Sequence, residues 1–186
     1  MQQGIAGSPE KPCNALLFCT RIMNILSKNA SLRALSVAGA FPWLLASGKK
    51  PIELRSWGER KHRNITLLHS SSSSYYEASF VQHRVSRQQC PKFAFIGAAT
   101  LVDVVCYDSR QKWERDIDKH LWDEDYDVVL GFYGDRPPYG HVFDNPVLFD
   151  EPILDVPGAY GYWQPKNDRQ KKGFEQAMKL LVAITR

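Results

Sequence analysis

The sequence lacks the long apolar runs of membrane proteins. No stretch of its 186 residues approaches the roughly 18 consecutive apolar residues that a membrane-spanning helix needs. The apolar segment Asn14–Cys19 is short, and no small-residue cleavage pattern follows it. We therefore expect neither a secretion signal nor an association with membranes.

Cysteine is scarce, and the cysteine and histidine residues form no pattern of metal ligands. There is no C-x-x-C pair, and no histidine stands at a zinc-ligand spacing from another histidine or from a cysteine. We expect no metal site and no cofactor. The four cysteines predict reduced, mostly buried thiols in a cytoplasmic protein rather than a disulfide framework, and they are Cys13, Cys19, Cys90 and Cys106.

Common catalytic motifs are also missing. The sequence contains no G-x-S-x-G nucleophile elbow, no G-x-x-x-x-G-K-S/T phosphate loop and no H-E-x-x-H metal motif. These absences argue against the serine hydrolases, nucleotide triphosphatases and zinc proteases that carry those motifs. Any catalytic activity has to come from a less common arrangement of side chains.

The charge is modest in total but uneven along the chain. The net charge is +4, yet residues 49–63 hold six basic against two acidic residues, whereas residues 114–127 hold seven acidic against two basic ones. Such an asymmetry favours an oriented approach to a polyanion such as a nucleic acid. Two alternatives stay open, namely an ordinary solvated surface and an acidic face that docks a protein.

The segment from Gly48 to Trp57 concentrates the chemically interesting residues. Gly48 suits the left-handed end of a helix over residues 41–46, and Pro51 can open a strand. Along that strand Ile52 and Leu54 would face the core. The opposite face would then carry Glu53, Arg55 and Trp57, with Lys50 leaning in from the turn. A cation, a carboxylate, a guanidinium and an indole within eight residues predict a binding or catalytic site.

The pattern G-x-K-x-x-E-x-R from Gly48 to Arg55 resembles the signature of the ASCH domain (activating signal cointegrator homology), a PUA-like β-barrel. The order of other segments resembles that family as well, over about Ser31 to Trp163. These segments are Ala34–Val37 with Pro42-Trp43, Leu67–Ser71, Ile96–Asp103, Tyr139–Val142, Glu151–Ile153 and Gly158–Trp163. The resemblance implies a single α+β domain built on a small PUA-like barrel with flanking helices.

We divide the chain accordingly. Residues 1–30 form an N-terminal extension with a short helix over Ala15–Leu26, residues 31–165 form the ASCH-like domain, and residues 166–186 form an amphipathic helix that packs on it. Within the domain, Ser74-x-x-Glu77 fits a capping box that would start a helix, but the serine run before it favours a loop, and Gly97 predicts a bulge in a long strand over residues 93–105. Further elements are a helix over 111–121 and strands over 65–69, 128–133 and 141–149.

The resemblance implies RNA binding, because PUA-like barrels are associated with RNA and with holding single or modified bases in a pocket. The residue types agree, since recognition of unpaired bases needs cations, stacking surfaces and a few polar groups. We expect single-stranded RNA or a nucleoside as the ligand. The predicted binding residues are Lys50, Glu53, Arg55, Ser56, Trp57, His69, Ser70 and Tyr139. Blander interpretations are a surface ion pair for Glu53 and Arg55, a buried histidine for His69 and core positions for Trp43 and Trp163.

An enzymatic alternative also follows from the resemblance. One ASCH branch resembles a small amidohydrolase that deacylates N4-acetylcytidine, with a lysine that activates a threonine. The lysine corresponds to Lys50, but the threonine position holds Glu53. Catalysis would then rest on Lys50 and Glu53, with an acid–base partner that the sequence leaves open among Asp123, Glu124 and Asp125. A third hypothesis is a protein-interaction module that uses the acidic segment and the C-terminal helix.

Overall fold

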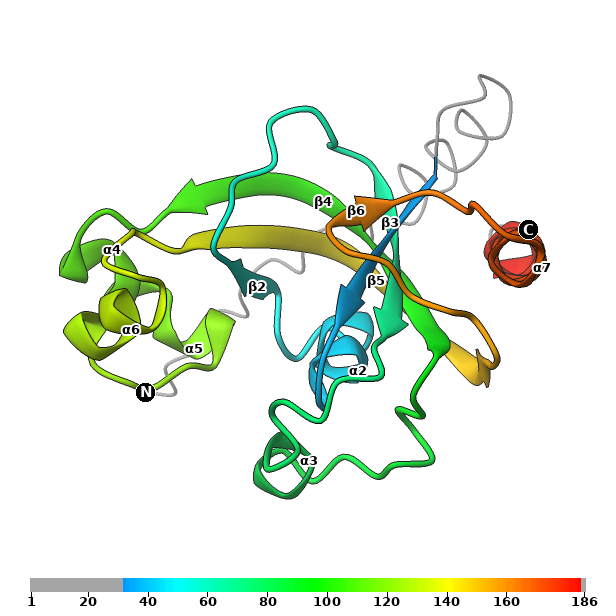
Figure 1. Ribbon diagram of the computed structural model, residues 1–186, viewed down its shortest axis with the longest axis horizontal. Helices are drawn as coiled ribbons and strands as arrows, with labels where there is room; N and C mark the ends of the chain where they lie inside the picture. Colours follow the sequence, from blue (N-terminus) through cyan, green and yellow to red (C-terminus); the bar gives the residue numbers. More distant parts are fainter. Residues whose placement is uncertain (1–31, 185–186) are drawn as a thin grey trace, which may run out of the picture.

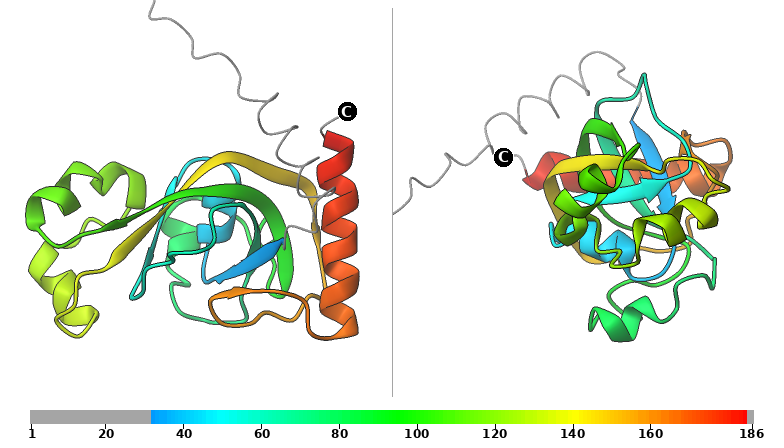
Figure 2. Two further views of the ribbon diagram at one scale, coloured as in Figure 1. Left: turned by 90° about the horizontal axis from the view of Figure 1, so that it is seen from above. Right: turned by 90° about the vertical axis from the view of Figure 1, so that its left-hand side faces the viewer.

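One mixed sheet organises residues 32–184, the part of the chain that the computed structural model describes (Figure 1). Its strands lie in the order β2-β5-β4-β3-β1-β6, with β1 parallel to β3 and the other pairs antiparallel. The bounds are β1 (Arg33–Val37), β2 (Ile52–Arg55), β3 (Ile65–Ser70), β4 (Ala94–Cys106), β5 (Tyr139–Ile153) and β6 (Tyr162–Trp163). The sheet curls into a half-barrel, which confirms the predicted α+β fold (Figure 2).

Three groups of helices surround the sheet. Helix α2 lies inside the curl, α4 to α6 form a group at one end of the long β4–β5 pair, and α7 stands at the other end (Figures 1 and 2). The bounds are α2 (Phe41–Ala46), α3 (Ser79–Gln82), α4 (Arg110–Arg115), α5 (Ile117–His120), α6 (Tyr126–Phe132) and α7 (Asp168–Ile184). None of the described helices combines the length and apolar composition that spanning a bilayer takes.

Each helical group has its own hydrophobic contacts. Phe174, Ala177 and Leu181 of α7 pack on the sheet together with Phe95 and Trp163. The side of the sheet that faces α2 is filled from α2, the strands and the segment around α3, and it includes Leu44, Leu45 and Phe80. A small aromatic core holds α4 and α6 to the sheet, and it consists of Leu54, Tyr107, Trp113, Tyr126 and Val129. Leu54 joins this core to β2, so the helical group is positioned next to the signature strand.

Several local predictions are confirmed. Helix α2 has Pro42 in its first turn, and Gly48 adopts the left-handed conformation just beyond its end, with φ of 76°. The register between β4 and β5 shifts between Phe95 and Gly97, which is the predicted irregularity. The predicted C-terminal helix is present as α7. The helix predicted over Ala15–Leu26 and the boundary at residue 30 lie outside the described residues.

Three local predictions are wrong. The alternative helix start at Ser74 and Glu77 is wrong and the favoured loop is present, because Tyr76 has a left-handed backbone with φ of 62° and α3 begins only at Ser79. The helix predicted over 111–121 is divided at Asp116 into α4 and α5. The strand predicted over 128–133 is helix α6, whose Asp125 cap accepts a hydrogen bond from the Asp127 amide.

Gly97 permits the closest approach of β4 to its neighbours. A Cβ atom at this position would lie 2.1 Å from the Val147 carbonyl oxygen and 2.8 Å from the Ala46 Cβ. We expect Gly97→Ala to lower the free energy of unfolding by about 1–3 kcal/mol, the usual cost of overpacking. Gly131 in α6 is the matched control, since a Cβ there meets nothing within 4 Å and Gly131→Ala should gain about 0.5–1 kcal/mol. Urea unfolding of both variants measures the difference, and equal stabilities would contradict the packing argument.

Candidate functional site

A cavity of about 610 Å³ opens between β2, α2 and the α4–α6 group. Its walls are rich in aromatic side chains that come from distant parts of the sequence. These are Phe41, Trp57, Tyr76, Trp122, Phe132, Tyr133 and Tyr160. Its polar residues include Lys50, Glu53, Arg55, Ser56, His120, Asp123 and Glu124. We call this cavity the aromatic pocket.

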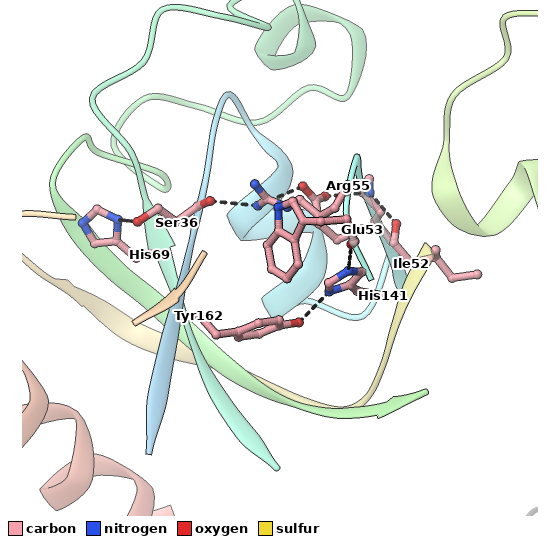
Figure 3. Close-up of polar contacts among 9 residues, drawn as sticks. Ser36, Ile52, Glu53, Arg55, His69, His141 and Tyr162 are labelled. Atoms are coloured by element: carbon pink, nitrogen blue, oxygen red, sulfur yellow. Dashed lines mark hydrogen bonds and ion pairs between the residues drawn. The ribbon is translucent and has the colours of Figure 1, made fainter. Parts of the chain in front are cut away.

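A buried cluster of charges belongs to the wall that β2 forms. Lys50 Nζ donates hydrogen bonds to the Ile52 carbonyl oxygen and, over 2.9 Å, to Glu53 Oε2. Arg55 Nη2 lies 3.3 Å from Glu53 Oε1 and donates a hydrogen bond of 2.8 Å to the Ser36 carbonyl oxygen (Figure 3). Lys50 and Glu53 are only 2% and 6% exposed. The carboxylate therefore lies between two cations in a site that excludes most water.

Burial and pairing shift the protonation equilibria in this cluster. Burial lowers the pKa of Lys50, although Glu53 partly offsets this. Burial alone would raise the pKa of Glu53, but Lys50 and Arg55 outweigh it and hold that pKa below its ordinary value. Glu53 is therefore ionised at neutral pH and already has a cation on each oxygen.

The position of Trp57 is fixed by its neighbours. His141 Nε2 lies 2.9 Å from the Trp57 carbonyl oxygen, which only accepts, so this nitrogen donates and Nδ1 accepts from the Tyr162 hydroxyl over 2.8 Å. The Trp57 ring meets His141 and Tyr162 edge to face, with centroids 4.8 and 5.6 Å apart. The strongly exposed Tyr160 lies 6.5 Å from Trp57 by ring centroid. Trp57 and Tyr160 thus offer stacking surface at the edge of the pocket.

The opposite wall comes from the acidic segment. Asp123 and Glu124 line the pocket, whereas Asp125 caps α6 and pairs with Arg110. Asp116, which the sequence places in the same acidic run, is buried and pairs with Lys119 over 2.7 Å. Much of the predicted acidic surface is thus neutralised internally, and the part that remains at the pocket is Asp123 and Glu124.

The structure brings together five of the predicted site residues and places three elsewhere. Lys50, Glu53, Arg55, Ser56 and Trp57 all line the pocket, because they belong to one short segment formed by β2 and the residues that flank it. The three that do not line it are His69, Ser70 and Tyr139.

Physical reasons account for the three that lie outside. His69 and Ser70 lie on β3, all six residues of which are buried and none of which lines the pocket. His69 Nε2 donates to the Val156 carbonyl oxygen over 2.8 Å, and its ring packs edge to face on Phe95 and Trp163. Tyr139 is paired with Arg55 in register, but its ring packs against Gly58.

Most aromatic residues of the pocket were missed by sequence reasoning. Tyr76, Trp122, Phe132 and Tyr133 lie far from the signature in the sequence. The position of the α4–α6 group next to β2 brings the last three to it, and the segment before α3 brings Tyr76. A weak signal was available, since Trp122 stands in an acidic, polar stretch where a solvent-facing tryptophan calls for an explanation.

Two further features bear on where the functional site lies. No group of three or more histidine, cysteine, aspartate or glutamate side chains among residues 32–184 could hold a metal ion. A broader groove of about 1540 Å³ runs between β5 and α7, but every ionisable residue that lines it is exposed. Strongly perturbed, buried charges mark functional sites, and the aromatic pocket has them.

Solved structures resemble this architecture. The structure of ASCH from Zymomonas mobilis matches with a TM-score of 0.54 and 15% identity, over 78% of this chain and 94% of that one. A serine-to-alanine variant of the same protein matches with a TM-score of 0.56 and 14% identity, over 78% of this chain and 96% of that one. A tyrosine-to-phenylalanine variant matches with a TM-score of 0.54 and 15% identity, over 78% of this chain and 97% of that one. The chain has an ASCH-like fold.

The similarity to ASCH structures is one of fold. No family model and no curated protein matches the sequence. The ASCH-like fold agrees with the resemblance that the G-x-K-x-x-E-x-R pattern predicts, and the residues of that pattern are the ones that form the buried charge cluster. What the pocket binds has to be argued from its own side chains.

Proposed function

We propose that the aromatic pocket binds a single nucleobase, either in a nucleoside or as an unpaired base of single-stranded RNA. The observation that carries the proposal is the set of seven aromatic side chains around one buried Lys50–Glu53–Arg55 cluster. Flat aromatic surfaces stack on bases irrespective of sequence, and a cavity of about 610 Å³ lies within the range of pockets for small ligands. The ASCH-like fold supports the proposal.

Arg55 supplies a specific hydrogen-bond donor. Its Nε is buried and has no acceptor among the described residues. That N–H is closed off from solvent, but the Arg55 side chain is 20% exposed and lines the pocket, so its guanidinium group can donate to an acceptor on the ligand, such as a base carbonyl oxygen. Glu53 and the Ser36 carbonyl oxygen hold the guanidinium group in a fixed position, which reduces the entropy that binding has to overcome. The pocket therefore favours bases that present an acceptor edge.

Removing the indole of Trp57 tests the proposal. We expect Trp57→Ala to weaken binding by about 1–3 kcal/mol, the contribution of one base–aromatic stack, and Trp57→Phe to recover part of it. Titration calorimetry with the four ribonucleosides and with short single-stranded RNA measures the loss. Tyr139→Ala is the control, because Tyr139 lies outside the pocket. Circular dichroism checks that each variant is folded, and equal affinities of wild type and a folded Trp57→Ala protein would contradict the proposal.

Amidohydrolase activity is a second candidate that the same pocket allows. Asp123 and Glu124 line the cavity that contains Lys50, and burial lowers the pKa of that lysine. A hydroxyl nucleophile is the weak point, because none of the hydroxyl groups described at the pocket is hydrogen-bonded to Lys50. Adding N4-acetylcytidine to the titrations separates the candidates: release of acetate favours the enzyme, and binding without release favours recognition alone.

A further inference from the structure

The cations inside the aromatic pocket are already engaged. Lys50 Nζ is buried against Glu53 and the Ile52 carbonyl oxygen, and Arg55 Nη2 is bound to Glu53 and to the Ser36 carbonyl oxygen. Contacts with phosphates of a strand are made chiefly by lysine and arginine side chains that exchange counterions with solvent. A ligand with a phosphate backbone therefore needs other cations close to the pocket.

The loop of residues 58–64 supplies such cations directly after Trp57. Arg60, Lys61 and Arg63 are exposed, and none of them forms an ion pair with an acid of residues 32–184. Glu59 is the one acid in the loop, and its carboxylate is occupied, since Oε1 accepts from the amides of Lys61 and His62 over 2.7 and 3.0 Å. The loop therefore presents unpaired positive charge.

Internal hydrogen bonds hold this loop in place. Arg63 Nη1 donates to the carbonyl oxygens of Glu59 and His62 over 2.8 and 2.9 Å. The buried His62 lies 2.9 Å from the Thr66 hydroxyl through its Nε2 atom. Arg60 and Lys61 thus extend from a fixed turn, which lowers the ordering cost of binding an anion.

A continuous series of ring contacts joins the loop to the pocket. The rings of His62 and Tyr162 are 4.9 Å apart, and those of Tyr162 and Trp57 are 5.6 Å apart. On the far side of the pocket, Asp123 and Glu124 repel a phosphate backbone. A strand with one base in the pocket is therefore directed away from the acidic wall and toward the loop.

We infer that the pocket reads a base within a single strand and that the loop of residues 58–64 binds the phosphates next to that base. This inference rests on the proposed function and narrows its ligand from nucleosides in general to oligonucleotides. Trp57 and Tyr160 provide the stacking surface between the pocket and the loop. Base recognition and backbone binding are thus divided between two neighbouring parts of the surface.

Variants of the loop test this division. We compare Arg60→Gln/Lys61→Gln with the control Lys172→Gln/Lys179→Gln, which removes the same charge from exposed positions on α7. Arg63 is left intact because its side chain supports the loop. The probes are the tightest-binding ribonucleoside from the titrations and a labelled octamer of single-stranded RNA made of that nucleotide, each measured over a salt series.

The loop variant should bind the octamer about tenfold or more weakly at low salt, and its log–log salt slope should be shallower by roughly 1 to 1.5. Its affinity for the nucleoside should equal that of the wild type. The α7 control should bind both the octamer and the nucleoside as tightly as the wild type does. Equal octamer binding by wild type and loop variant, or an equal loss in the control, overturns the inference and leaves base recognition standing. A wild type that binds neither probe would overturn the proposed function and the inference together.

Discussion

Glu53→Ala should lower the free energy of unfolding by about 3–5 kcal/mol, the usual loss when one partner of a buried ion pair is removed. The carboxylate of Glu53 contacts Lys50 Nζ over 2.9 Å and Arg55 Nη2 over 3.3 Å. Its removal leaves Lys50, which is 2% exposed, without a counter-charge. Lys50→Met should cost less, because Glu53 keeps Arg55 as its partner.

A double substitution separates the contribution of the Lys50–Glu53 pair to the free energy of unfolding from the loss caused by leaving one partner unpaired. In Lys50→Met/Glu53→Leu the buried amine and the carboxylate are both gone, and only the partly exposed Arg55 loses its acid, so we expect much of the stability lost in Glu53→Ala to return. Urea unfolding at pH 7 gives the three free energies. A loss below about 1 kcal/mol in Glu53→Ala would mean that the pair behaves as an exposed surface ion pair, against its burial in the structure.

The expected loss of stability makes Lys50 and Glu53 poor positions for testing binding. From the sequence, Lys50 is a predicted binding residue, and its replacement would be expected to weaken binding. The structure places its amine in a closed set of contacts with Glu53 and the Ile52 carbonyl oxygen, so its replacement acts on stability first. Trp57 and the loop of residues 58–64 are better positions for testing binding, because they lie closer to solvent.

The sequence predicted best what depends on local chain geometry. Gly48 ends α2 and Gly97 marks the irregularity in β4, because each position needs a backbone that other residues adopt poorly or would fill with a clashing side chain. The site residues of the signature were predicted for the same reason, because they are near neighbours on β2 and directly beside it. These features need no knowledge of the rest of the chain.

The sequence predicted poorly what depends on tertiary contacts. Val128 and Val129 read as a strand by composition, yet burial of Tyr126 and Val129 at helical spacing against Trp113 selects helix α6. Glu77 does not cap a helix and instead contacts Arg87 and Lys92. The far wall of the aromatic pocket exists only because this helical group packs beside β2, which no local pattern encodes.

Acid should destabilise the protein before most carboxylates are protonated. Burial lowers the pKa of His62, His69 and His120 to about 4, from an ordinary value of 6.5. Between these two pH values the histidines are protonated in the unfolded chain and neutral in the folded protein. The free energy of unfolding is therefore highest above pH 6.5 and falls as the pH drops toward 4. The lowered pKa of Glu53 adds a loss that starts only below its ordinary value of 4.5.

His69 offers the clearest test of this transition, because it is fully buried and both of its ring nitrogens have a hydrogen-bond partner. Its Nε2 is bound to the Val156 carbonyl oxygen, and Ser36 Oγ lies 3.0 Å from Nδ1. The Trp163 indole N–H donates to the same Ser36 oxygen over 3.0 Å, which leaves the hydroxyl hydrogen of Ser36 for His69 Nδ1. A proton on Nδ1 would break this arrangement, so the neutral ring is favoured by about 3 kcal/mol over the full window. His62 and His120, whose pKa values are lowered as far, contribute comparably.

The slope of stability against pH tests this argument independently of any general loss of packing. Urea unfolding between pH 4.5 and 7 should give a slope near pH 5 that is smaller in His69→Gln than in the wild type by about 1.4 kcal/mol per pH unit, the contribution of one proton. His83→Gln is the control, because that ring is only half-buried and should change the slope less. Equal slopes in wild type and His69→Gln would mean that His69 takes up a proton in the folded protein as readily as in the unfolded chain, which its enclosure between Phe95 and Trp163 contradicts.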